Sequence, residues 1–144
     1  YVNWNGAANA IYAGAFGFET FPTNVEGSLG VFEDLDNYIT GPRDWLKYCK
    51  YSYGRAVDIA CNLIRRAWLS REEALLILPR LERFPWTYLG KPLADILRPF
   101  DVTVAEFVKV CDRFTNPSLF RFDGATPAKT PDGSPIPVTE HNYS

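Results

Sequence analysis

The sequence predicts a small, mostly α domain with a long loop near its N-terminus and an irregular, Pro-rich tail. Two features predict the helices: apolar residues recur at the 3.6-residue helical period, and two capping boxes mark helix starts. A third observation is that no alternating apolar pattern of strand length occurs. The chain has 144 residues, the size of one domain with one core, and we expect about five helices.

The N-terminal part predicts one short helix and then a long loop. Residues 5–16 are rich in alanine, Asn5 is a suitable N-cap, and Gly17 favours the end of the helix. Residues 17–40 mix turn formers with isolated aromatic residues, which predicts a loop with one turn near residues 34–38. Loops of this length are often functional, so this one is a candidate for substrate contact.

The central part predicts two helices separated by a break. Pro42 suits the first turn of a helix over residues 43–51, and residues 52–54 interrupt it. A second helix is expected over residues 55–67. Its expected buried stripe consists of Val57, Ala60, Cys61, Ile64 and Trp68.

A capping box marks the start of the next helix. The Ser70 hydroxyl can accept from the backbone N–H of Glu73, whose carboxylate reaches back, so a helix is expected from Arg71. Pro79 is expected to kink or end it. Residues 84–90 then predict a connector.

Two further helices are expected before the tail. Residues 93–100 predict a short helix closed by Pro99, and a second capping box at Thr103 and Glu106 opens a helix that runs to about Phe114. The residues expected to face inward are Phe107, Val110, Cys111 and Phe114.

The C-terminal residues 122–144 differ in composition from residues 1–121, the expected helical domain. Their succession of Pro, Gly, Asp and Thr can bury little surface, so an extended or partly disordered tail is expected. The single histidine, His141, lies in this tail, which argues against His-based acid–base catalysis and most His-ligated metal sites.

Composition narrows the class of protein. Hydrophobic residues make up 47% and charged residues 22%, as in folded globular domains, and the net charge of -2 argues against general nucleic-acid binding. No apolar run approaches the roughly 20 residues that span a bilayer, so neither a membrane span nor a signal peptide is expected. Cys49, Cys61 and Cys111 form an odd set without a CxxC pair, which favours reduced cytosolic thiols over disulfides or zinc.

Basic residues form a candidate phosphate-binding face. Arg43, Lys47 and Lys50 have the spacing i, i+4, i+7 on one helix face, and Arg55 follows the break. Arginine offers phosphate a bidentate fork and lysine a point charge. The alternative, and the more common case, is a solvated face whose charges pair with acids such as Asp44.

The next helix carries a polar ridge of Arg55, Asp58, Asn62 and either Arg65 or Arg66 opposite its apolar stripe. Such a ridge is usually surface. Gly54, just before it, permits a close backbone approach to either a ligand or a neighbouring helix.

Aromatic residues are dense beside these cations. Trp45, Tyr48, Tyr51 and Tyr53 could stack on a base or sugar, but aromatic residues at helical spacing are more often core.

Acidic residues gather in the long loop at Glu26, Glu33, Asp34 and Asp36. They are candidates for acid–base groups or Mg²⁺ ligands, and solvated loop acids are the more common alternative.

Residues 41–58 (GPRDWLKYCKYSYGRAVD), Ile64-Arg65 and residues 70–74 (SREEA) carry a family resemblance. They resemble the C-terminal part of the N-acetyl sugar amidotransferases of bacterial surface-polysaccharide biosynthesis. The family pattern is G-x-R-D-Y-L-K-Y-x-K-x-G-Y-G-R-A-T-D, then I-R-x-G, then T-R-E-E-A. Further segments that agree in order are residues 1–5, 26–36, 107–116 and 132–137.

The resemblance implies a PP-loop ATP pyrophosphatase-type enzyme of lipopolysaccharide and O-antigen biosynthesis. With ATP and Mg²⁺ it activates the acetamido oxygen of a nucleotide-linked amino sugar, and ammonia from a glutaminase partner gives the acetamidino group. The family's Ser-Gly-Gly-x-Asp-Ser loop lies on an N-terminal α/β domain that this sequence, which begins at Tyr1 and contains no Met, does not include. The chain is therefore expected to be a cytoplasmic C-terminal region that binds ATP mainly outside itself and is inactive alone.

The resemblance also selects site residues. The matching positions are Arg43, Lys47, Lys50, Gly54, Arg55, Arg65, Arg71 and Glu73. Arg71 and Glu73 are better explained by the capping box than by a role in the site. We expect substrate phosphates to bind Arg43, Lys47, Lys50, Arg55 and Arg65, with Glu26 and Asp36 as loop candidates. Departures from the pattern include Ser52, Val57 and residues 66–68, and they leave the sugar undefined.

Two other functions stay open at this point. One is a non-catalytic helical domain that docks a partner, for instance the glutaminase, through its aromatic surface. The other is an independent module that binds a nucleotide sugar.

Overall fold

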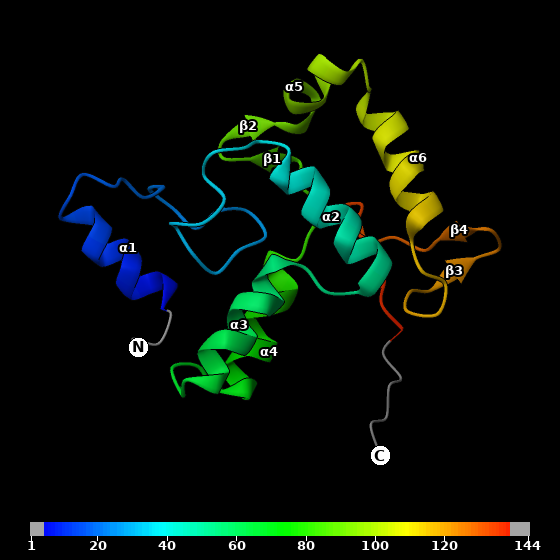
Figure 1. Ribbon diagram of the computed structural model, residues 1–144. Coiled ribbons are helices and arrows are strands. Elements are labelled where there is room, and N and C mark those ends of the chain that lie inside the picture. The colour runs from blue at the N-terminus through cyan, green and yellow to red at the C-terminus, as the bar shows by residue number, and fades with distance from the viewer. Residues whose placement is uncertain (1–4, 139–144) are drawn as a thin grey trace.

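Helices dominate the structure, a computed structural model that describes residues 5–138, so the mostly α class is confirmed (Figure 1). The helices are α1 (Gly6–Gly14), α2 (Thr40–Tyr51), α3 (Arg55–Arg65), α4 (Arg71–Leu81), α5 (Leu93–Leu97), the 3-10 turn η1 (Arg98–Phe100) and α6 (Val104–Phe114). Two antiparallel hairpins pair β1 (Thr87–Tyr88) with β2 (Lys91–Pro92), and β3 (Phe122–Asp123) with β4 (Thr126–Pro127). His141 and most of the segment 1–5 lie outside the described residues.

Side-chain caps fix where the helices begin. The Asn5 carboxamide accepts from the N–H of Ala8 at 3.1 Å and starts α1. Both predicted capping boxes form, at Ser70 with Glu73 and at Thr103 with Glu106. A local hydrogen-bond pattern therefore decides the starts of α1, α4 and α6, as the sequence predicts.

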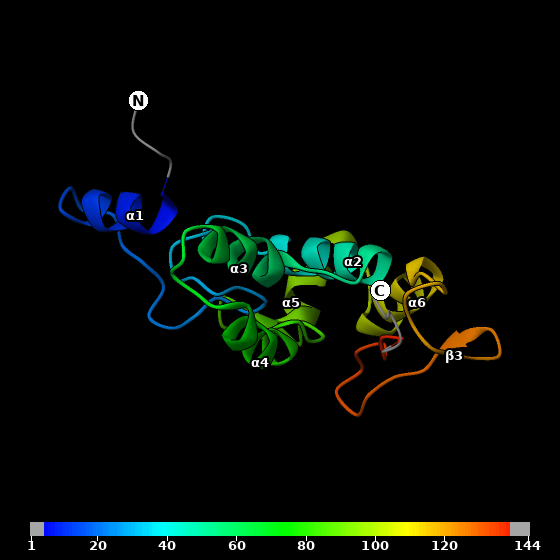
Figure 2. The ribbon, with the colours of Figure 1, turned by 90° about the horizontal axis from the view of Figure 1, so that it is seen from below.

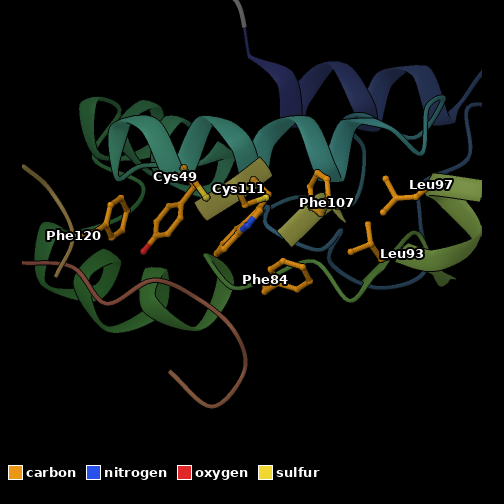
Figure 3. Close-up of a cluster of buried hydrophobic side chains, with 9 residues drawn as sticks. Cys49, Phe84, Leu93, Leu97, Phe107, Cys111 and Phe120 are labelled. Carbon is orange, nitrogen blue, oxygen red and sulfur yellow. The ribbon is translucent and has the colours of Figure 1, made fainter. Parts of the chain in front are cut away.

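The main core lies where α2 packs against α6 (Figure 3). Trp45 stacks on Tyr48 with ring centroids 5.0 Å apart, and Phe84 meets Trp45 edge-on at 5.6 Å. The buried members of this core are Trp45, Tyr48, Cys49, Phe84, Leu93, Leu97, Phe107, Cys111 and Phe120. The core interpretation of Trp45 and Tyr48 is therefore confirmed, whereas Tyr51 and Tyr53 are exposed.

All three cysteines are free thiols, as predicted. Cys49 and Cys111 lie side by side in this core and their side chains form a hydrogen bond (Figure 3). That bond and burial raise the pKa of the Cys111 thiol, so this thiol packs as a small neutral group. Cys61 is exposed on α3.

The stripe predicted for α3 is confirmed at Ala60 and wrong at Cys61 and Trp68. Ala56 and Ala60 are buried, whereas Cys61 is exposed and Trp68 lies beyond the helix with 58% of its surface exposed. Figure 2 shows α2 and α3 in one layer and α4 beneath α3. Small alanine side chains let α3 pack closely against neighbouring helices, which rotates the larger residues away from the core.

Two inward positions predicted for α6 are also wrong. Phe107 and Cys111 are buried, but Val110 is 41% and Phe114 45% exposed. Phe114 lies at the edge of the α2 contact, where the Lys50 ammonium sits 4.8 Å from its ring centroid. A partly hydrated cation–π contact replaces burial there.

Pro79 does not end α4, which continues to Leu81. A proline at this position removes the hydrogen bond to the carbonyl of Leu75, one turn earlier. Leu75 is 59% exposed, so water can reach that side of the helix. The free-energy cost of the missing hydrogen bond is therefore small enough for α4 to continue past Pro79.

The predicted connector at residues 84–90 is in part a hairpin. Leu89 and Gly90 both have positive φ angles, 50° and 73°, which form a tight two-residue turn between β1 and β2. Each strand has only two residues, too short for an alternating pattern to show in the sequence. The hairpin leads directly into α5.

The C-terminal segment follows the body of the domain as extended chain up to Val138, where the description ends. Bridges join Phe120 to Pro137 and Lys129 to Pro135, and the buried Ser134 hydroxyl accepts from the N–H of Phe84 at 2.9 Å. Extended chain is one of the two predicted states. The division into residues 1–121 and a separate tail stays a prediction.

No helix among residues 5–138 combines the length and the apolar character that crossing a bilayer requires.

Gly41 is required by the close approach of α2 to the β1–β2 hairpin. A Cβ atom at this position would lie 2.7 Å from the Tyr88 ring, which is itself buried. We expect Gly41→Ala to lower the free energy of unfolding by about 1–3 kcal/mol, the usual cost of overpacking a core. Thermal or urea unfolding measures the loss.

Gly14→Ala is the matched control for this variant, because nothing lies within 4 Å of the added methyl group on α1. It should cost no stability, since alanine favours helix. Equal stability of the two variants would contradict the packing argument.

Candidate functional site

A pocket of about 360 Å³ lies between the long loop, the first half of α2, the start of α3, the end of α4 and residues 84–88. The loop contributes residues 24–28 with Glu33 and Asp34, and α4 with the turn after it contributes residues 80–83. Aromatic side chains from Trp45, Trp86 and Tyr88 also line it. Segments far apart in the sequence therefore build one concave surface with mixed polar and apolar walls.

Arg55, the first residue of α3, is held by two acids of the loop. Its Nε and Nη2 donate to Oε2 of Glu33 at 3.0 and 2.5 Å, and Nε lies 3.7 Å from Oδ2 of Asp34. Burial alone would lower the pKa of Arg55, but the hydrogen bond and charge of Glu33 and the charge of Asp34 outweigh it and raise that pKa. The group is a fixed cation inside an acidic wall.

Glu82 closes the pocket at the start of α3. Its carboxylate accepts from the N–H of Gly54 at 2.6 Å and also bonds the N–H of Val57, so it caps a helix that has no side-chain cap of its own. A Cβ at Gly54 would lie 3.1 Å from Oε1 of Glu82. Of the two uses left open for Gly54, the structure shows approach to a residue of this chain.

Glu26 fastens the loop to the hairpin. Its two carboxylate oxygens accept from Oγ1 of Thr87 at 3.0 Å and from the N–H of Leu89 at 2.9 Å. The Tyr88 hydroxyl donates to the carbonyl of Asp34 at 3.2 Å and holds the same loop from another point. Asp36, the other loop candidate, is exposed and does not line the pocket.

The five predicted phosphate-binding residues do not gather at one place, and of these five Arg55 is the one that lines the pocket. Arg43 lies 3.1 Å from Asp44, and Lys47 lies 2.5 Å from Asp58. Lys50 reaches toward α6, and Arg65 donates to the carbonyl of Cys61. Their phosphate-binding role stays a prediction.

Several pocket residues are not predicted as site residues by the sequence. Arg80 comes from the last turn of α4, Arg83 from the turn after it, and Trp86 from the segment expected to be a connector. The Trp86 indole N–H donates to the carbonyl of Asp132 at 2.9 Å, which fixes its ring beside the pocket. No spacing in the sequence groups these residues, because the approach of α4 to the C-terminal segment brings them together.

Within residues 5–138, no group of three or more His, Cys, Asp or Glu side chains is arranged to hold a metal ion. The Mg²⁺-ligand alternative for the loop acids has no such cluster to support it.

The sequence of residues 23–129 matches the family described as LPS biosynthesis protein WbpG-like, C-terminal domain. The chain belongs to this family. The resemblance carried by residues 41–74 is thereby confirmed, and the WbpG-like domain takes part in lipopolysaccharide biosynthesis. A comparison with curated proteins finds no match.

The WbpG-like match includes every residue that lines the pocket, whereas α1 lies before it. Four positions of the amidotransferase pattern converge on the pocket wall: Gly41, Asp44, Gly54 and Arg55. Part of the most specific segment of the sequence therefore lines the pocket.

Glu82 should give the stability of the domain a distinct pH dependence. Burial raises its pKa above the ordinary 4.5, although the two N–H bonds oppose this. The folded state then binds more protons than the unfolded state, so the contribution of Glu82 to the free energy of unfolding falls as pH rises from about 4.5 through its raised pKa. The Glu82→Gln variant lacks this titrating group, so its free energy of unfolding relative to that of the natural protein should increase over the same pH range.

Chemical denaturation at a series of pH values measures this difference. Glu19→Gln, in the exposed loop, is the same substitution at an exposed position and serves as the control. A stability difference for Glu82→Gln that does not change with pH would contradict the assigned burial of this carboxylate.

Proposed function

We propose that this WbpG-like domain is the part of a cytoplasmic ATP-dependent amidotransferase that binds the nucleotide-linked amino sugar. The enzyme converts the acetamido group of the sugar to an acetamidino group with ammonia from a glutaminase partner. The observation that carries the proposal is the convergence of Gly41, Asp44, Gly54 and Arg55 on one pocket. ATP and Mg²⁺ bind mainly outside this domain.

The chemistry defines what such a domain must do. ATP transfers AMP to the acetamido oxygen and releases pyrophosphate, which makes the oxygen a leaving group. Ammonia then forms the new C–N bond, and AMP departs with the oxygen. The binding domain has to hold the sugar in one orientation while these groups meet, and restricted orientation is a large share of catalysis in such two-substrate steps.

The pocket supplies the groups for that task. The acids Glu33 and Asp34 can accept from sugar hydroxyls, and the guanidinium between them can donate to a carbonyl or hydroxyl oxygen. The ion pairs hold these side chains in place before the ligand arrives, which lowers the entropy cost of binding.

Arg55→Ala tests this role. It removes the donor and leaves Glu33 and Asp34 facing each other as unpaired acids. In the intact protein with ATP, Mg²⁺ and ammonium, we expect kcat/KM for the nucleotide sugar to fall tenfold or more, about 1.4 kcal/mol. Mass spectrometry of the acetamidino product gives the rate.

Arg113→Ala, on the exposed side of α6 away from the pocket, is the matched control and should keep the natural rate. Lys50→Ala tests the wider phosphate-binding hypothesis in the same assay. Product formation by Arg55→Ala at the natural rate and KM would rule out the pocket as the sugar site.

A partner-docking domain is the second candidate, and exposed apolar side chains favour it. α1 has no buried residue and exposes Ile11 and Tyr12, at 79% and 71%. α4 exposes Leu75 and Leu76, at 59% and 73%. Apolar surface of this kind is typical of interaction sites.

Analytical ultracentrifugation of the chain with the glutaminase tests docking. If α4 binds the partner, a complex forms and Leu76→Glu weakens it at least tenfold, while Glu72→Gln on the same helix does not. Absence of a complex would exclude docking of the glutaminase by this chain.

A further inference from the structure

Charges of opposite sign reach the pocket from different parts of the fold. The loop and α2 supply the carboxylates Glu26, Glu33, Asp34 and Asp44. The last turn of α4 supplies the guanidinium group of Arg80, and the turn after the helix supplies that of Arg83. The remaining charged groups are Arg55, which lies against the loop acids, and Glu82, which caps α3. The pocket therefore has an acidic wall and a basic edge.

The basic edge has free hydrogen-bond donors. Arg80 lies in the last turn of α4, is exposed, and meets no acid or hydrogen-bond acceptor among residues 5–138. Arg83 is 61% exposed and lies 3.9 Å from Asp132, a loose ion pair that leaves most of its donors open. Arg55 differs from both because two loop acids already hold it.

The volume of the pocket limits what it can enclose. About 360 Å³ is near the lower end of the roughly 300–1,000 Å³ typical of small-molecule sites. One pyranose ring fits, and a whole nucleotide sugar does not. Trp86, 53% exposed and held by Asp132, offers an aromatic face on which the C–H side of a sugar ring can pack.

We propose that the pocket binds a nucleoside-diphosphate N-acetylamino sugar in one orientation, with the sugar ring against the acidic wall and the diphosphate outside on Arg80 and Arg83. This rests on the proposed function and adds the binding mode to it. Carboxylates accept from sugar hydroxyls and repel phosphate, whereas guanidinium groups bind phosphate oxygens with bidentate geometry. The reversed orientation would place two phosphates against the loop carboxylates and leave both arginines without a phosphate partner.

Arg80→Ala separates the two halves of this site. Isothermal titration of the intact protein with UDP-N-acetylglucosamine and with free N-acetylglucosamine compares a ligand that has the diphosphate with one that lacks it. We expect the natural protein to bind the nucleotide sugar at least tenfold more tightly than the free sugar. Arg80→Ala should lose most of that advantage and keep its affinity for the free sugar within twofold.

Two further variants control for charge and for conservative replacement. Arg71→Ala removes the same charge from the opposite end of α4, outside the pocket, and should bind both probes normally. Arg80→Lys should recover part of the affinity, since lysine keeps the charge without the fork.

The outcomes distinguish this inference from the function on which it rests. Equal binding of UDP-N-acetylglucosamine by the natural protein and by Arg80→Ala would overturn the orientation and leave the sugar site in place. An equal loss of affinity for both probes in Arg80→Ala would also overturn the orientation, because Arg80 would then affect the whole pocket. Binding of neither probe by the natural protein would overturn the proposed function together with the inference.

Discussion

The packing of Trp45 is the contact on which the rest of the structure depends. Its ring stacks on Tyr48 and meets the edge of Phe84, and this locks α2 to the segment that follows α4. α2 then carries the core on one side and Asp44 on the pocket side. The indole N–H of Trp45 is buried and has no hydrogen-bond partner among the described residues, a cost that the aromatic contacts around it must offset.

Charge pairing inside the chain explains why the basic residues of the family pattern do not gather at one place. Lys47 faces Asp58 on α3, and Arg55 faces Glu33 in the loop. Even the positive end of α3 is occupied, because Glu82 accepts from its first N–H groups. These pairs tie α2, α3, α4 and the loop together, so residues that resemble a binding motif hold in place the elements that surround the pocket.

Sequence reasoning succeeded where the cause is local. Capping boxes and an Asn cap depend on side chains three residues apart, so the helix starts were predictable. The buried side of α3 was not, because its period is compatible with two neighbouring stripes and only the tertiary fit of Ala56 and Ala60 selects one. In the pocket, the family pattern indicated Arg55, whereas Arg80 and Trp86 depend on how distant segments meet.

The bond between Glu26 and Leu89 has a consequence for the order of folding. It joins residues 63 apart in the sequence, and the bond between Phe84 and Ser134 joins residues 50 apart. Closing chain segments of this length costs entropy before the contacts form, so we expect local helices to form first and these links to form late. A change at Glu26 should therefore speed unfolding much more than it slows folding, and we expect the pocket to be completed last.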